Sequence, residues 1–269
     1  MVDSLDSGCP VPNQTENLGG WLDRIAPLLD ESLQVGQQEQ LLVYARLLRE
    51  WNQKLNLTAI LDDEGIAVRH FQDSLTVIPD LRLQQSVLAA RQDIPAAALR
   101  RTLRLADVGS GAGFPGLVLK IACPEIEVVL IDSLAKRLRF LDTVIETLGL
   151  TGITTVHARA EDAGRQKGLR EQFDVVVARA VASLPVLAEY CLPLVRPGGQ
   201  FIAMKGQLEE ELPAAARAIE ILGGRPPQVR RFTLPGTDMS RSVVVVGKIR
   251  KTPPLYPRKA GKVEQSPLE

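Results

Sequence analysis

From residue 102 onward, short apolar runs alternate with longer amphipathic stretches. Runs suited to β-strands lie at 103–108, 126–131, 153–157, 173–178 and 200–204, and stretches with helical spacing lie at 115–122, 134–148, 183–195 and 207–222. Strands that alternate with helices predict a mostly parallel, doubly wound α/β sheet. The runs at 229–234 and 242–247 are separated by only seven residues, too few for a crossover helix. We therefore expect seven strands, with the last two paired as a terminal antiparallel hairpin.

The N-terminal part of the chain has a different pattern. Residues 37–55 place Leu41, Leu48 and Leu55 at helical spacing, and a second helix is predicted from Asp62 onward. The polar residues 1–17 predict a disordered lead, and 82–101, which has no clear period, is either a linker or a helical insertion. The expected organisation is a helical region over 18–101, a sheet domain over 102–250 and a basic C-terminal tail over 251–269.

Composition narrows the class of protein only slightly. Net charge is zero, so a polyanionic partner would have to be bound by local charge. The three cysteines, Cys9, Cys123 and Cys191, are odd in number and widely spaced, which favours neither a disulfide framework nor a metal site. No apolar run approaches the roughly 18 residues of a membrane span, and the acidic N-terminus has no signal-like apolar core. We expect a soluble, cytoplasmic protein.

The stretch LADVGSGAGFPG, residues 105–116, follows the first predicted strand and has two possible registers. Gly111, Gly113 and Gly116 fit a dinucleotide fingerprint, whereas Asp107, Gly109, Gly111 and Gly113 fit the loop that binds S-adenosylmethionine (SAM) in methyltransferases. The strand ends at Val108, so Gly109 is the first turn glycine, and Pro115 is best used to start the next helix. The SAM register is favoured, and nicotinamide-dependent oxidoreduction is the rival hypothesis.

Polar residues at the ends of the predicted strands supply the remaining candidate contacts to SAM. Asp107 can engage the methionine ammonium, directly or through water. Asp132, 23 residues after Gly109, and the adjacent Ser133 end the second strand, where a carboxylate can accept hydrogen bonds from ribose hydroxyls. Glu161 follows the third strand, the usual place for a contact to the adenine amino group.

Several further stretches together resemble one family. They are WNQKLNLTAI (51–60), VRHFQDSL (68–75), DVGSGAGFPG (107–116), DSLAKRLRFL (132–141), ARAVASL (178–184), MKGQ (204–207) and YPRKAG (256–261). In this order they resemble the bacterial ribosomal RNA small subunit methyltransferase G family, also called glucose-inhibited division protein B (GidB/RsmG). The resemblance implies a Rossmann-like class I methyltransferase that methylates guanine N7 in 16S rRNA, within the 30S subunit or an assembly intermediate. It also implies SAM contacts by Gly109, Phe114, Ala160, Glu161 and Arg179.

Methylation of guanine N7 requires no general base, because the ring nitrogen already has an exposed lone pair, and proximity can supply most of the acceleration. The candidates are therefore substrate-positioning residues: Arg69, His70, Asp73, Arg179 and Lys205. Arg179 could order SAM or the loop, hold a phosphate or the guanine edge, or pair with a structural acid. Arg69, His70, Asp73 and Ser74 are interpreted as a polar cluster that joins the helical region to the cofactor cleft and is a candidate for RNA contact.

Two basic clusters are candidates for RNA contact. Lys136, Arg137 and Arg139 open the helix after Asp132, where acids are the usual residues. Arg258 and Lys259 belong to the basic tail. The alternatives are a SAM-dependent methyltransferase acting on another RNA, a protein or a small molecule, and a silent SAM-binding module. No metal is expected, and the chain is expected to act as a monomer.

Overall fold

The computed structural model describes residues 18–23, 33–89, 102–206, 208 and 210–268. The lead expected over 1–17 lies outside these ranges, as does the 90–101 part of the segment without a clear period. The remainder, 82–89, is helical.

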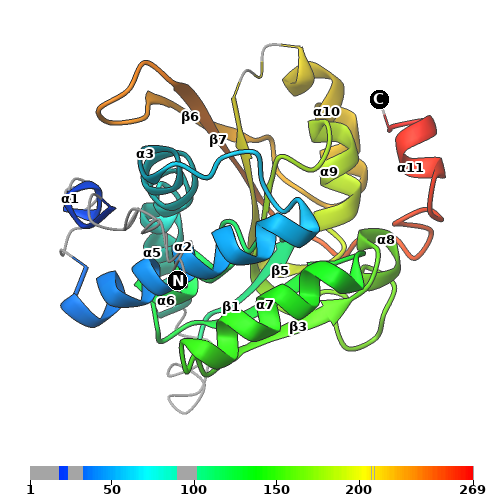
Figure 1. Cartoon of the computed structure of the whole chain (residues 1–269). Coiled ribbons are helices and arrows are strands. Elements are labelled where there is room, and N and C mark those ends of the chain that lie inside the picture. The colour runs from blue at the N-terminus through cyan, green and yellow to red at the C-terminus, as the bar shows by residue number, and fades with distance from the viewer. Residues whose placement is uncertain (1–17, 24–32, 90–101, 207, 209, 269) are drawn as a thin grey trace, which may run out of the picture.

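A seven-stranded sheet crosses the molecule in the order β3-β2-β1-β4-β5-β7-β6 (Figure 1). Neighbouring strands among β1 to β5 are parallel, and β7 is antiparallel to both β5 and β6. The seven-stranded, mostly parallel sheet and its terminal hairpin are confirmed. The bounds are β1 Arg104–Val108, β2 Glu127–Asp132, β3 Ile153–His157, β4 Phe173–Arg179, β5 Val195–Lys205, β6 Gln228–Thr233 and β7 Ser240–Gly247.

Helices cover both faces of the sheet (Figure 1). One face packs against α2 (Val35–Leu55), α6 (Gly116–Ala122) and α7 (Ala135–Thr147), and the other against α8 (Ala160–Ala163), α9 (Leu184–Cys191) and α10 (Glu211–Ile221). Within β4, Val175 and Val177 belong to the first core and Val176 and Ala178 to the second, because side chains alternate across a strand. A strand buried on both faces reads as a continuous apolar run, which is why these strands were predictable.

The helix expected from Asp62 runs without a break from residue 63 to 75, but it changes from α to π geometry and back. Asp62 caps α3 (Asp63–Gly65) by accepting a hydrogen bond from Gly65 N at 2.7 Å. A π-helical segment, η2 (Ile66–Gln72), α4 (Asp73–Leu75) and α5 (Ile78–Ala89) follow, and a short helix, α1 (Leu18–Leu22), precedes α2. π-Helical turns are rare and occur frequently at functional sites. Their wider turn shifts the side-chain period, so an α-helical pattern does not predict them.

The helical region and the sheet share one core. Tyr44 of α2 stacks on Phe114 of the glycine-rich loop, with 5.4 Å between ring centroids, and lies 5.7 Å from Phe71 of η2. The Tyr44 hydroxyl also donates a short hydrogen bond to the carbonyl oxygen of Ala112 in the same loop. The N-terminal helices therefore support the loop that follows β1.

The C-terminal segment does not extend from the domain as a free basic tail. Arg258 makes a two-pronged ion pair with Glu189 of α9, whose carboxylate is fully buried, and its backbone N–H donates to the same carboxylate at 2.7 Å. Val263 of α11 (Lys262–Gln265) is also fully buried. The prediction of a tail was wrong. It rested on the basic residues of this segment alone, and the sequence did not reveal that Glu189 of α9 pairs with Arg258.

Candidate cofactor and substrate site

The glycine-rich loop turns sharply at the carboxyl end of β1. Gly109 follows Val108 directly, and its N–H donates to the Ile131 carbonyl oxygen of β2 at 2.8 Å. Gly109, Gly111 and Gly113 have φ angles of 72°, 57° and 99°, which side chains rarely adopt. A Cβ on Gly113 would lie 2.6 Å from the Tyr44 hydroxyl oxygen and 2.5 Å from Leu117 Cδ1. The loop therefore requires glycine for its conformation and for close packing.

Two carboxylates fix the loop by accepting hydrogen bonds from its backbone N–H groups. Asp107 Oδ2 accepts a hydrogen bond from Gly116 N at 2.8 Å, and Asp132 Oδ2 accepts one from Gly111 N at 2.9 Å. Asp107 is completely buried, and burial raises the pKa of its carboxyl from 3.8 to about 7. Its Oδ1 has no hydrogen-bond partner in the described part of the chain. A buried, unpartnered carboxylate oxygen is costly, so it favours a cationic or hydrogen-bonding ligand at this point.

A cavity of about 310 Å³ opens over the ends of β1 and β2, near the lower limit for small-molecule sites. Five predicted cofactor residues line it: Gly109, Asp132, Ser133, Ala160 and Glu161. Glu161 is 4% exposed, and its carboxylate accepts no hydrogen bond from the described residues. We call this the cofactor cavity.

The far wall of the cofactor cavity comes from α9 and the C-terminal segment. Tyr190, Gly261 and Glu264 line it, and the Tyr190 hydroxyl donates to Glu264 Oε1 at 3.0 Å. Sequence reasoning missed all three residues. The YPRKAG stretch, which contains Gly261, was the available signal in the sequence. Because it lies far from the glycine-rich loop along the chain, the sequence gave no reason to place the two at one cavity.

Five other residues predicted to contact SAM are not among those that line this cavity: Asp107, Gly111, Gly113, Phe114 and Arg179. Gly111 and Gly113 shape the loop, and the Phe114 ring is buried between the rings of His70, at 4.3 Å, and Tyr44. The Arg179 guanidinium lies over the same ring, with 5.1 Å from Cζ to the centroid. Phe114 thus supports Arg179 from beneath, through a stacked contact worth about 1 kcal/mol in general.

A second cavity, of about 520 Å³, lies beside the first, and Ala180 lines both. Its walls come from η2, from the ends of β4 and β5, and from the β6–β7 hairpin. All five predicted substrate-positioning residues line it: Arg69, His70, Asp73, Arg179 and Lys205. We call this the substrate cavity.

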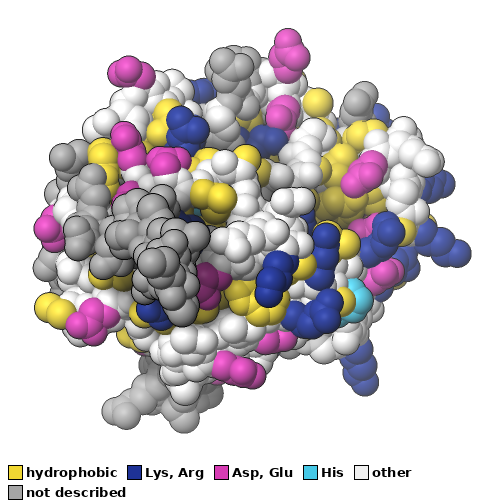
Figure 2. Space-filling model, viewed as in Figure 1, with side chains coloured by type: hydrophobic (Ala, Val, Ile, Leu, Met, Phe, Trp, Pro, Cys, Tyr) yellow, Lys and Arg dark blue, Asp and Glu magenta, His cyan; other side chains and the backbone are white. Residues whose placement is uncertain are grey.

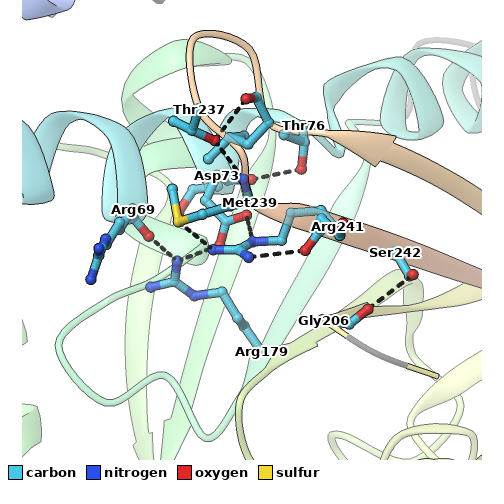
Figure 3. Close-up of polar contacts among 12 residues, drawn as sticks. Arg69, Asp73, Thr76, Arg179, Gly206, Thr237, Met239, Arg241 and Ser242 are labelled. Atoms are coloured by element: carbon cyan, nitrogen blue, oxygen red, sulfur yellow. Dashed lines mark hydrogen bonds and ion pairs between the residues drawn. The ribbon is translucent and has the colours of Figure 1, made fainter.

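Asp73 organises one wall of the substrate cavity (Figure 3). Its Oδ2 accepts from Arg179 Nη1 at 3.0 Å and its Oδ1 accepts from Arg241 Nε at 2.8 Å. Arg179 Nη1 also donates to the Arg69 carbonyl oxygen at 2.9 Å. The wall is therefore a carboxylate held between two guanidinium groups, and Arg241, on β7, is a member that sequence reasoning missed.

His70 is not placed as a general base. Its Nε2 lies 3.0 Å from the Thr58 hydroxyl, and its Nδ1 lies 3.5 Å from Arg179 Nη2. Burial first, and then the positive charge of Arg179, lower the pKa of His70 from 6.5 to about 4. Near neutral pH the ring is uncharged and serves as a stacking surface for Phe114.

The remaining wall contains Lys205 and Glu211. Lys205 Nζ donates to Glu211 Oε2 at 2.8 Å and to the Ala182 carbonyl oxygen at 2.9 Å. Glu211, the first residue of α10, also accepts from Leu184 N at 2.6 Å through Oε2. Sequence reasoning missed Glu211, because a carboxylate at the start of a helix is usual for helix stability alone.

The basic residues of α7 have mixed roles. Lys136 and Arg139 are exposed, whereas Arg137 Nη1 lies 3.4 Å from Asp132 Oδ2 and faces the cofactor cavity. Figure 2 shows Lys and Arg side chains gathered over and beside α7. Within the described residues, no group of three His, Cys, Asp or Glu side chains is placed to hold a metal ion. Among the described helices, none combines the length and apolar character that a membrane span needs.

The sheet order, the glycine-rich turn after β1 and the acids ending β1 and β2 define a Rossmann-like class I SAM-dependent methyltransferase. A family model described as "GidB: rRNA small subunit methyltransferase G" matches residues 37–240. The chain is 50% identical over 232 residues to ribosomal RNA small subunit methyltransferase G of Acetivibrio thermocellus, covering 86% of this chain and 89% of that protein. It is 48% identical over 227 residues to the protein of the same name from Geobacillus kaustophilus, covering 84% and 89%. The chain belongs to the ribosomal RNA small subunit methyltransferase G family.

Proposed function

We propose that this protein transfers a methyl group from SAM to N7 of a guanine in 16S ribosomal RNA. Family membership supports the RNA substrate, and one structural observation supports the reaction: the cofactor and substrate cavities adjoin at Ala180. Ala180 directly follows β4, at the edge of the sheet where ligands of doubly wound folds bind.

The residues of the cofactor cavity fit SAM, together with the buried Asp107, which directly precedes Val108 and Gly109 of the cavity wall. When bound, SAM supplies an electrophilic methyl group on a positively charged sulfur. Asp132 would accept hydrogen bonds from the ribose, Glu161 from the adenine amino group, and Asp107 would face the ammonium group. The unpartnered, buried Oδ1 of Asp107 is the observation that supports this fit.

The substrate cavity is suited to positioning rather than to proton transfer. Guanine N7 brings its own lone pair and releases no proton when it is methylated, so a base is unnecessary. The pKa of His70, about 4, leaves its ring neutral, and both Asp73 oxygens are engaged by arginines. Holding the two reactants in line accounts for a large share of the acceleration in such displacements.

RNA contact outside the cavity is assigned to Lys136, Arg139 and Lys259, which are exposed. Arg137 and Arg258 are left out, because their guanidinium groups pair with Asp132 and Glu189. We infer that the substrate is the 30S subunit or a late assembly intermediate, met in the cytoplasm. We also propose that the chain acts as a monomer.

The test is methyl transfer from labelled SAM to 30S subunits, free 16S rRNA, a protein mixture and small acceptors. The subunits come from cells that lack this protein, and cleavage at N7-methylguanine then maps the modified position. We expect one N7-methylguanine in 16S rRNA. Transfer to a protein or small acceptor only would support the alternative methyltransferase function, and binding of SAM without transfer would indicate a silent module.

A further inference from the structure

Glu211 is the carboxylate of the substrate cavity with an oxygen that no described residue engages. Its Oε2 is fixed by Leu184 N at 2.6 Å and Lys205 Nζ at 2.8 Å, one from the start of α9 and one from the end of β5. Its Oε1 accepts no hydrogen bond from any described residue, and the side chain is 29% exposed on the cavity wall. The two donors thus hold the carboxylate through Oε2 and leave Oε1 as an acceptor that no described residue engages.

The other carboxylate lining this cavity cannot play the same part. Asp73 Oδ1 and Oδ2 accept from Arg241 and Arg179, so both oxygens already face charged donors. The arginine and lysine side chains of the cavity offer donors only. A ligand that presents hydrogen-bond donors therefore finds its charged acceptor at Glu211.

Guanine presents such donors at one edge. Its N1–H and its exocyclic N2 amino group lie on the Watson–Crick edge, which also carries O6, whereas N7 lies on the Hoogsteen edge, across the ring system from the N2 amino group. N7 must face the cofactor cavity at Ala180, so the Watson–Crick edge must face away from it. On this basis, which rests on the proposed function, we propose that Glu211 Oε1 accepts a hydrogen bond from the N2 amino group and thereby selects guanine.

This assignment also explains how adenine is rejected. Adenine has a N7 of similar accessibility but carries a hydrogen at C2 and no amino group there. Glu211 would then be left facing a C–H group after losing water. A site built to hydrogen-bond a substrate N–H rejects analogues that lack it far more strongly than a hydrophobic pocket does.

The variant Glu211→Gln tests the assignment with little change in shape. Leu184 N and Lys205 Nζ are both donors, so the amide oxygen must take the place of Oε2. The amide NH₂ group then faces the cavity and opposes the guanine amino group, donor against donor. Glu210→Gln is the matched control, because Glu210 is the preceding residue and is exposed.

The experiment compares the two enzymes on two substrates. Reconstituted 30S subunits carry either guanosine or inosine, which lacks the N2 amino group, at the position that the wild-type enzyme methylates. We expect kcat/KM of the wild type to fall about 10- to 100-fold from guanosine to inosine, the usual cost of one lost hydrogen bond to a charged group. Glu211→Gln should lose a similar factor on guanosine and show no further loss on inosine. Glu210→Gln should behave as the wild type.

Other outcomes overturn the assignment. If the wild type methylates inosine and guanosine equally well, the enzyme does not recognise the N2 amino group. This comparison uses the wild-type enzyme alone, so it does not depend on the folding of a variant. If Glu211→Gln loses the same factor on both bases, its effect is structural, and SAM affinity by calorimetry will show whether the fold is retained. If the wild type methylates no guanine of 16S rRNA, the proposed function itself fails, and the assignment fails with it.

Discussion

Asp73 and Arg179 lie 106 positions apart in the chain and form a 3.0 Å ion pair. Asp73 belongs to the N-terminal helices and Arg179 to the end of β4, so this pair joins the two parts of the molecule at the wall of the substrate cavity. The side chains are 8% and 14% exposed, which protects the pair from solvent. Because Asp73 also holds Arg241, one carboxylate sets the positions of two cations.

Asp73→Asn should impair methylation far more than SAM binding. An amide cannot balance two guanidinium groups, so we expect a loss of about 1–3 kcal/mol in the free energy of unfolding. kcat/KM should fall at least tenfold, and SAM affinity should change less than twofold, since Asp73 does not line the cofactor cavity. Denaturant unfolding, calorimetry and methylation of 30S subunits measure the three quantities.

The matched control is Asp80→Asn, which removes the 2.7 Å pair between Asp80 and Arg230 outside both cavities. This variant should lose some stability and keep its activity. Equal losses of activity in the two variants would mean that Asp73 has no role beyond joining the helices to the sheet.

Arg258→Ala should weaken SAM binding rather than RNA binding. It leaves the buried Glu189 carboxylate without its cation, a change that typically costs about 3–5 kcal/mol. The segment bearing Gly261 and Glu264 should then leave the wall of the cofactor cavity, and we expect SAM affinity to fall about tenfold or more. Calorimetry measures this loss. Lys259→Ala, at an exposed neighbour, should leave SAM affinity and stability unchanged, and the opposite pattern would restore Arg258 as an RNA contact.

The double variant Lys136→Gln/Arg139→Gln should bind RNA with a weaker dependence on salt. Each phosphate contact contributes a slope of about 0.7–0.9 in a plot of log affinity against log salt, so the slope should fall by about 1.4–1.8. Binding of 16S rRNA fragments between 50 and 300 mM salt, roughly the range in which such effects are large, provides the measurement. A wild-type methylation rate that does not respond to salt, at unchanged SAM affinity, would rule out these phosphate contacts.

SAM affinity should rise with pH through the titration of Asp107. Burial raises the pKa of this carboxyl to about 7, so below pH 7 the ligand-free protein holds a proton where the ammonium group should lie. We expect affinity to increase roughly tenfold between pH 5.5 and 7.5, below the pKa of about 8 typical of an α-amino group. Binding should release a proton, which calorimetry in buffers of different ionisation enthalpy detects.

Asp107→Asn should abolish this pH dependence and lower SAM affinity at pH 7.5. In the ligand-free protein, the free energy of unfolding changes with pH in the opposite direction to SAM affinity. A raised pKa in the folded state means that stability is lost as pH rises through 7, so the asparagine variant should be the more stable protein at pH 8. A wild-type affinity that is constant over this range would show that Asp107 does not face the ammonium.

The centre of the sheet could be predicted because β1 and β4 are buried on both faces and therefore appear as apolar runs. Gly109, Asp132, Ser133, Ala160 and Glu161 could be placed for a related reason. Each follows a predicted strand, and the carboxyl ends of parallel strands meet at one edge of the sheet. Residues at that edge are distant in sequence but adjacent by topology.

Tyr190, Glu264, Arg241 and Glu211 could not be placed in this way. Tyr190 and Glu211 lie on helices, Arg241 on the antiparallel strand, and Glu264 on a segment that returns to α9 after the sheet is complete. Their positions depend on contacts between side chains that are distant in the sequence, such as the pairing of Arg258 with Glu189. The pattern of hydrophobic and polar residues does not reveal such partners. The contact of Phe114 with SAM, which the family resemblance implies, stays a prediction, and the packing of its ring against Tyr44 could not be read from the sequence either.

The hydrogen bond from the Tyr44 hydroxyl to the Ala112 carbonyl oxygen has a practical consequence. It joins a helix that precedes the sheet by about fifty residues of chain to the glycine-rich turn that follows β1. The change of pattern at residue 102 therefore does not mark a place where the protein can be divided. A fragment that starts there would expose the rings of Phe114 and Phe140, which Tyr44 of α2 covers, and its glycine-rich turn would lose the hydrogen bond from Tyr44.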